Sequence, residues 1–189
     1  MWLSMVVVMM TPTVLPWVWA YATLVAPSPS ARAWPAAAPF VGGYFAVWLL
    51  YSAAMAALQT ALAAAGVLTG DRLAGWAGPL VLIAAGAYQF APLKTACLTH
   101  CRNPLTYFLA RWRNGPVGGF RLGLAHGWYC LGCCWAVMLT ALAIGVMDLA
   151  WMAALTVVVA VEQVAPAGVW AGRAFGAGLV AWGLWRLSA

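Results

Sequence analysis

Charge is the property that this sequence has least of. Only 6% of the 189 residues are charged, with three acidic against nine basic side chains, whereas a soluble domain has about 25% charged residues. The chain has too few charges to cover itself with a hydrated surface, which excludes an ordinary soluble domain. Its basic residues are also too few and scattered for a nucleic-acid interface. The sequence has no phosphate-cradling glycine loop and no phosphorylated-aspartate motif of an ion pump.

Apolar residues take the place of the missing charges. They make up 66% of the chain, and the mean hydropathy is +0.92. Thirteen tryptophans fit the same pattern, because indole rings favour the headgroup level of a bilayer. We predict an all-α protein, a polytopic transmembrane helix bundle that forms one integral membrane domain over residues 1–189.

Turn signals cut the chain into about six apolar segments, each close to the roughly 20 residues that a spanning helix needs. The predicted spans are 2–25, 41–68, 73–93, 120–146, 149–164 and 169–185. The first lacks a basic region and a cleavage site, so it is interpreted as a retained span rather than a signal peptide. We expect Pro12 and Pro16 to kink it. Because the last two segments are short, five spans with one re-entrant piece is an alternative.

The basic residues predict an orientation. The stretch 94–119 between the third and fourth spans carries Lys94, Arg102, Arg111 and Arg113, and Arg32 in the first linker lies on the same face. The opposite face has only Arg72 and Arg186. Since positive charge is retained on the cytoplasmic side, we expect 94–119 to be a cytoplasmic loop and both termini to lie outside.

All five cysteines and both histidines fall between residues 97 and 134. On a helix, residues three or four apart share a face, and two such sets are present. The seven candidate metal ligands are Cys97, His100 and Cys101 in the first set and His126, Cys130, Cys133 and Cys134 in the second. Clustering of this kind favours ligands over cysteines that merely pack as small apolar side chains.

Thiolate and imidazole donors suit Cu(I) and Zn(II), and sets rich in sulfur favour the softer ion. The sequence therefore predicts a soft transition-metal site, with copper preferred and zinc as the alternative; three or four of the seven side chains would suffice. Met5, Met9 and Met10 in the first span are further soft donors, although packing is the preferred interpretation for them.

The function that this site predicts is metal handling or delivery, and two other functions remain open. Cys130 and Cys133 form a C-x-x-C unit that would serve a membrane thiol–disulfide oxidoreductase, although no thioredoxin-like pattern surrounds it. Alternatively, the protein is a structural accessory subunit in which zinc or thiols staple the third and fourth spans. The pattern favours binding over catalysis.

Polar groups inside apolar spans are costly and are usually paired. Glu162, near the end of the fifth span, is expected to pair with Arg173. The alternative is that it supports the site by accepting a hydrogen bond from a ligating histidine. Gln89 lies on the same side as the cluster. We expect it to support the metal ligands, as Glu162 does in that alternative.

The blocks "YQFAPLKTACLTHCRNPL" and "GLAHGWYCLGCCWAVM" resemble the signature of the DUF2182 family, bacterial proteins predicted to be metal-binding and integral to the membrane. The stretches "MVVVMMTPTVLP", "GGYFAVW" and "MDLAWMAALTVVVAVEQVAP" are similar to other parts of its pattern. The resemblance implies the bacterial inner membrane, the same seven ligands, and Gln89, Lys94 and Glu162 as pattern residues. The expected partners are the lipid bilayer, a metal ion, and a metal-donor protein or a membrane enzyme that receives the metal.

Overall fold

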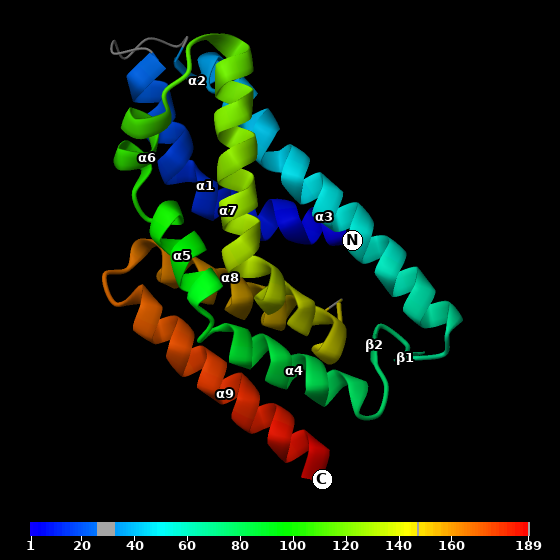
Figure 1. Cartoon of the computed structure of the whole chain (residues 1–189). Helices are drawn as coiled ribbons and strands as arrows, with labels where there is room; N and C mark the ends of the chain where they lie inside the picture. Colours follow the sequence, from blue (N-terminus) through cyan, green and yellow to red (C-terminus); the bar gives the residue numbers. More distant parts are fainter. Residues whose placement is uncertain (26–32, 147, 189) are drawn as a thin grey trace.

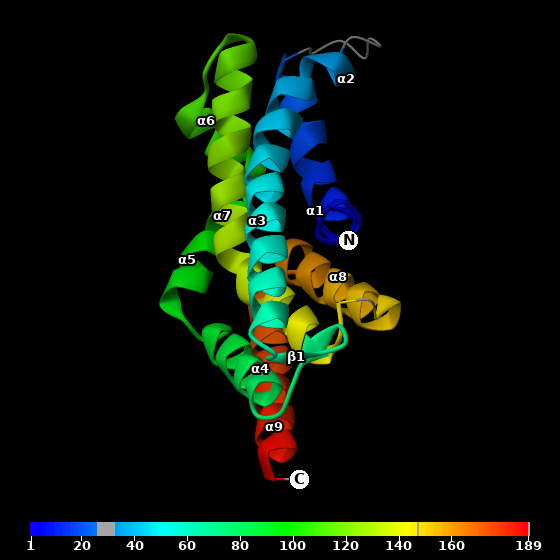
Figure 2. The same cartoon turned by 90° about the vertical axis from the view of Figure 1, so that its right-hand side faces the viewer.

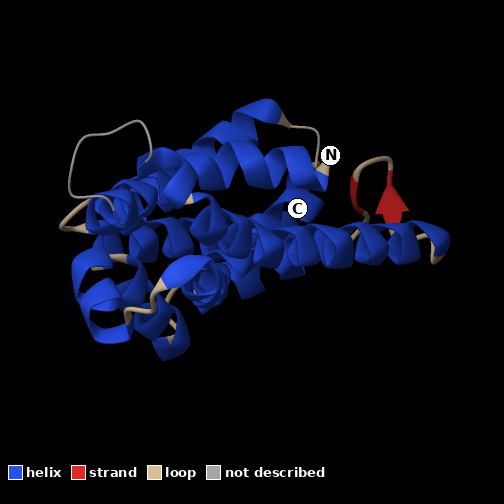
Figure 3. Cartoon of the chain, turned by 90° about the horizontal axis from the view of Figure 1, so that it is seen from above, coloured by secondary structure: helices blue, strands red, loops and turns tan. Residues whose placement is uncertain are grey.

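The computed structural model describes residues 1–25, 33–146 and 148–188, and this part of the chain is almost wholly helical (Figures 1 and 3). The predicted all-α class is confirmed. A short hairpin joins β1 (Leu68–Thr69) to β2 (Arg72–Leu73). The helices are α1 (Trp2–Val25), α2 (Ala33–Ala36), α3 (Ala38–Ala64), α4 (Ala77–Tyr88), α5 (Pro92–Cys101), α6 (Pro104–Arg111), α7 (Gly115–Ile144), α8 (Leu149–Val164) and α9 (Gly168–Ser188). Arg32, which we predicted to lie on the cytoplasmic side, is outside the described residues.

Three of the described helices, α1, α3 and α7, are long and apolar enough to cross a membrane. Helices α4 and α5 meet the same test together, but they are bent by 64° at the break between them. Helix α8 is apolar but has only 16 residues. By length and composition the described chain therefore offers three spans, or four with the bent pair, where the sequence indicated about six.

The third predicted span, 73–93, does not form one helix. Helix α4 ends at Tyr88, and Pro92 begins α5. Proline has no N–H to donate and disfavours helical geometry in the residue before it; Ala91 is accordingly extended, with φ −66° and ψ 138°. The chain changes direction at this point.

The stretch 94–119 was expected as a polar loop, but most of it is helical. It holds nearly all of α5, the whole of α6 and the beginning of α7. Each of these helices has a proline in its first turn, namely Pro92, Pro104 and Pro116, a position where a missing N–H costs nothing and the fixed φ suits a helix. Helix α5, which was expected as part of a loop, packs against α7.

Glycines let the first half of α3 approach α7 closely (Figure 2). A Cβ added at Gly43 would overlap the Phe120 carbonyl, and one added at Gly123 would overlap the Phe40 carbonyl. Small residues at such crossings allow backbone contact between apolar helices. This crossing fixes Tyr44 of α3 against the middle of α7.

Helix α1 bends around the other helices (Figures 1 and 2). Pro12 and Pro16 lie inside it, and prolines are the usual cause of such bends. Its beginning lies against α8. Nearer its end, Trp17 meets the Phe108 ring of α6 edge to face, and Tyr21 stacks on Phe40 of α3. Elsewhere, α9 packs along α4 (Figure 1).

Adjacent glycines in α3 provide a test of the α3–α7 crossing. Gly43→Ala should destabilise the protein by about 1–3 kcal/mol, the usual cost of overpacking. Gly42→Ala is the matched control: an added Cβ there meets nothing within 4 Å, so better helix propensity should make the protein slightly more stable, by up to about 1 kcal/mol. Thermal unfolding in detergent, followed by circular dichroism, measures both; equal midpoints for the two variants would contradict the crossing.

Candidate metal centre

Three thiols converge where α5 meets α7. The sulfur atoms of Cys101, Cys130 and Cys133 all lie within 4.8 Å of one another, and the side chains are only 1–2% exposed. None of them is in a disulfide. Sulfurs bound about 2.3 Å from one ion lie about 4 Å apart in a trigonal arrangement, and Cys133 Sγ is 4.0 Å from Cys101 Sγ. The three thiols therefore need little movement to hold one ion.

Two of the thiols share a face of α7 because they are three residues apart in the helix. The Cys133 thiol donates to the Cys130 carbonyl over 3.1 Å. Cys134 is also buried, and its sulfur lies 3.3 Å from that of Cys133. Cys134 is not part of the three-sulfur group, but its sulfur is close enough to serve as an additional metal ligand.

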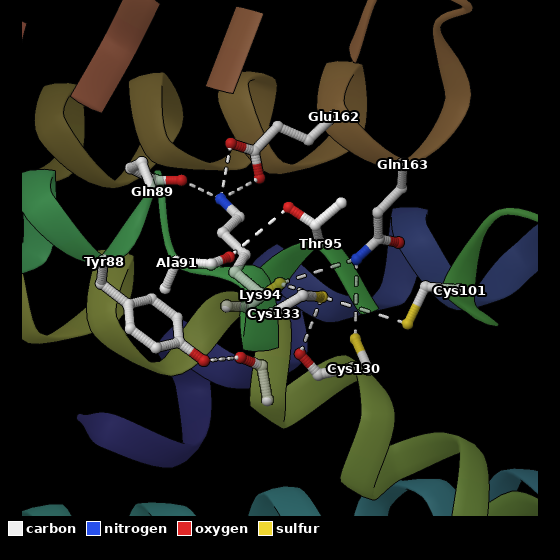
Figure 4. A network of polar contacts seen from close by, with 12 residues as sticks. Tyr88, Gln89, Ala91, Lys94, Thr95, Cys101, Cys130, Cys133, Glu162 and Gln163 are labelled. Carbon is white, nitrogen blue, oxygen red and sulfur yellow. Dashed lines mark hydrogen bonds and ion pairs between the residues drawn. The ribbon is translucent and has the colours of Figure 1, made fainter. Parts of the chain in front are cut away.

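Polar groups from three other helices contact the cluster. The Tyr44 hydroxyl of α3 shares a hydrogen bond of 3.3 Å with the Cys130 thiol. From α8, Gln163 Nε2 lies 3.6 Å from the sulfurs of both Cys130 and Cys134 (Figure 4 shows Gln163 beside Cys130). From α1, the Trp17 indole N–H donates to the Cys101 carbonyl over 3.1 Å.

The sequence missed Tyr44 and Gln163 as neighbours of the cluster. They lie 86 and 33 residues from Cys130, so helical spacing does not connect them to it. The one available signal was the presence of an amide inside an apolar segment, where such groups require a partner.

The two histidines and Cys97 lie outside the three-sulfur group, although His126 is one helical turn from Cys130 and stacks on Trp17 and Tyr44, which both contact the cluster. His126 is buried among aromatic rings and stacks on Trp17, with 3.7 Å between ring centroids. His100 is exposed and stacks on Tyr129 at 4.3 Å. Cys97 packs against Gly132 of α7, where an added Cβ would lie 2.7 Å from its sulfur. The structure thus brings together three of the seven predicted ligands, with Cys134 beside them.

Helix α6 closes the side of the site on which His126 lies. Phe108 is fully buried against Trp17, and the Tyr107 hydroxyl donates to the Leu122 carbonyl over 3.1 Å. Burial raises the pKa of Tyr107 to about 12, so this hydroxyl stays protonated and keeps its donor role at neutral pH.

A buried ion pair lies next to the thiols (Figure 4). Lys94 Nζ is 2.7 Å from both carboxylate oxygens of Glu162, and it also donates to the Gln89 side-chain oxygen. The expected pair between Glu162 and Arg173 was wrong, because Lys94 takes the carboxylate. The Arg173 guanidinium lies over the Trp170 ring instead, 5.3 Å from its centroid.

This ion pair ties α5 to α8, and Arg102 ties them again at the other end of α5. Arg102 Nη2 donates to the Ala165 carbonyl over 2.6 Å and to the Pro166 carbonyl over 3.1 Å. Cations are favourable at a helix carboxyl end. Cys101 is therefore carried on a short helix that is fastened at both ends. The direct support of metal ligands by Glu162 and Gln89 stays a prediction.

Comparison with known proteins gives one family. A family model described as "PpoB2: Copper chaperone" matches residues 1–186. Its name differs from that of the family to which the sequence blocks were likened, but it supports the predicted relation to copper. No curated protein and no solved structure shows significant similarity to the chain.

Removing one partner of the ion pair should destabilise the protein strongly. Glu162→Gln leaves the Lys94 charge buried without its counter-ion, which typically costs about 3–5 kcal/mol. Replacing both residues, as Lys94→Met with Glu162→Met, should restore most of the stability, since apolar replacement of a whole buried pair is often neutral.

Thermal unfolding of the three proteins, with copper content measured in parallel, separates structure from ligation. If Glu162→Gln unfolds like the parent and only its copper affinity falls, by about 10–100-fold as for groups that support metal ligands, the structural role of the pair is wrong.

Proposed function

The chain belongs to the PpoB2 copper chaperone family, and we propose that it holds a cuprous ion in its thiol cluster and delivers it to a partner protein. The observation that carries this proposal is the convergence of three free, buried thiols from two helices, Cys101 of α5 and Cys130 and Cys133 of α7. Copper is here the cargo of the protein rather than a resident cofactor.

The donor set supports Cu(I) over Zn(II). Thiolates select soft ions, and the three grouped sulfurs are enough for a trigonal cuprous ion. A structural zinc site, which is almost always closed by four ligands, would also have to recruit Cys134. The three-sulfur group contains no imidazole. A cuprous ion bound by three thiolates forms a complex with net negative charge. The Tyr44 hydroxyl and the Gln163 amide contact the sulfurs and are placed to donate hydrogen bonds to these thiolates. Such hydrogen bonds stabilise thiolate ligands.

The membrane is part of the proposal. Helices α1, α3 and α7, together with the bent pair α4–α5, would cross a bacterial inner membrane four times, which their length and composition support. The excess of basic residues in 94–119 supports a cytoplasmic position for the stretch that leads from this pair through α6 to α7, and four crossings place both termini outside. A partner that receives the ion, a membrane enzyme or another metal carrier, is expected from the chaperone function.

The two alternatives predict different chemistry. A thiol–disulfide oxidoreductase needs one sulfur that a partner disulfide can reach, but Cys130 and Cys133 are both 1% exposed. A structural staple is favoured by one observation, namely that Cys101 and Cys133 join α5 to α7. In that case loss of metal would unfold the protein.

Cu(I) titration of the full chain in detergent, without oxygen and against a competing chelator, tests the proposal. Cys101→Ser, Cys130→Ser and Cys133→Ser should each lose the tight site, because each removes one of the three converging sulfurs. Cys97→Ser is the matched control: it lies on the same helix as Cys101, and we expect it to keep the site.

Three results would contradict copper delivery by this cluster. Equal copper binding in Cys97→Ser and Cys133→Ser would place the site elsewhere. Tightly retained zinc whose removal unfolds the bundle would favour the staple. A protein that binds no metal but forms a reversible Cys130–Cys133 disulfide would favour redox exchange.

A further inference from the structure

A second group of sulfur atoms lies between α1 and α8. The two helices, with Val146, line an open cavity of about 470 Å³. Among the described residues, four thioethers line it: those of Met1, just before α1, of Met5 and Met9 in α1, and of Met152 in α8. Met1, Met5 and Met9 are spaced four residues apart, so they form one stripe along α1.

Among the side chains that line the cavity, the soft donors are thioethers. The described lining residues include no carboxylate, imidazole or thiol. Its two hydroxyls are satisfied within their own helices: Thr156 donates to the Met152 carbonyl over 2.7 Å, and Ser4 donates to the Met1 carbonyl over 3.1 Å. The sulfurs are therefore the donors that remain available.

The stripe on α1 leads from this cavity to the thiols. After Met5 and Met9 it continues, again at intervals of four, to Thr13 and Trp17, and all four side chains are buried. Trp17 is the residue that donates to the Cys101 carbonyl. At 1.5 Å per residue, Met9 and Trp17 are about 12 Å apart along the helix.

The opposite wall leads to the same place. On α8, Met152 and Thr156 line the cavity, and the same face continues through Val159 to Gln163 at helical spacing. Gln163 is the residue whose amide contacts the sulfurs of Cys130 and Cys134. Both walls of the cavity thus end at the thiol cluster.

We propose that Met5, Met9 and Met152 form a binding site for a monovalent soft cation, Cu(I), in the cavity between α1 and α8. Methionine often fills gaps in apolar cores because its side chain is flexible. Here the side chains of Met5 and Met9 are 3% and 0% exposed, and together with Met152 they also line the cavity. Uncharged thioethers bind soft ions and are poor ligands for Zn²⁺ and other harder ions. Because they carry no proton to lose, binding at this site is independent of thiol ionisation.

The site rests on the proposed function in that the ion is the same copper cargo. It would hold Cu(I) on the same helix faces that reach the thiols, with weaker, neutral ligands. Its position gives the ion a place in the apolar bundle before or after the thiol cluster.

Methyl NMR tests the site directly. The full chain, labelled with [methyl-¹³C]methionine, is titrated in detergent with Ag(I), a diamagnetic and redox-inert analogue of Cu(I). Ultraviolet absorption from silver–thiolate bonds reports the cysteines in the same sample. Met→Leu variants, which nearly conserve volume and are tolerated best in cores, assign the signals. Met55, buried in α3, is the control methionine.

We expect the methyl signals of Met5, Met9 and Met152 to move together at one stoichiometric step, while that of Met55 stays in place. Met9→Leu should abolish the movement of the other two, and Zn(II) should move none of them.

Methyl signals that stay fixed while the thiols bind silver would overturn this site and leave the thiol function standing. Movement of all methionines including Met55, or unchanged shifts of Met5 and Met152 in Met9→Leu, would also overturn it. Moving methionines without silver–thiolate absorption would support this site and contradict the thiol function.

Discussion

The ion pair between Lys94 and Glu162 is the interaction on which the site depends. Two charges buried in an apolar bundle are tolerated only when each has a partner, so α5 has one stable position against α8. With Arg102 bound to the carbonyls that follow α8, the short helix is held at both ends. That position places Cys101 opposite Cys130 and Cys133.

The metal centre is a product of long-range packing more than of local sequence. Its thiols come from α5 and α7, and the groups that contact them come from α1, α3 and α8. Each contact depends on a particular backbone approach, such as the glycine crossing that fixes Tyr44 beside α7. A change far from the cluster can therefore alter its geometry without touching a ligand.

Local pattern predicted those parts of the fold that depend on local chemistry. The bounds of α1 and α8 agree with the predicted spans 2–25 and 149–164, because apolar runs and turn residues define them. The shared face of Cys130 and Cys133 follows from helical spacing. The different orientations of Cys101 and His100 did not follow, because the break before Pro92 decides which side of α5 meets α7. The partner of Glu162 was missed for the same reason: the bend between α4 and α5 brings Lys94, not Arg173, to the carboxylate.

The nearly complete burial of the three thiols also has a kinetic meaning. An ion held where the ligands are 1–2% exposed cannot leave until some helix moves aside, so its residence time follows the free energy of local opening as much as the strength of the metal–sulfur bonds. Helices α3 and α7 are in close backbone contact and α5 is fastened at both ends, so this opening requires interhelical contacts to break that are separate from the metal–sulfur bonds. Affinity and lability are thereby separable properties in this protein: one belongs to the sulfurs, and the other to the packing of the helices around them.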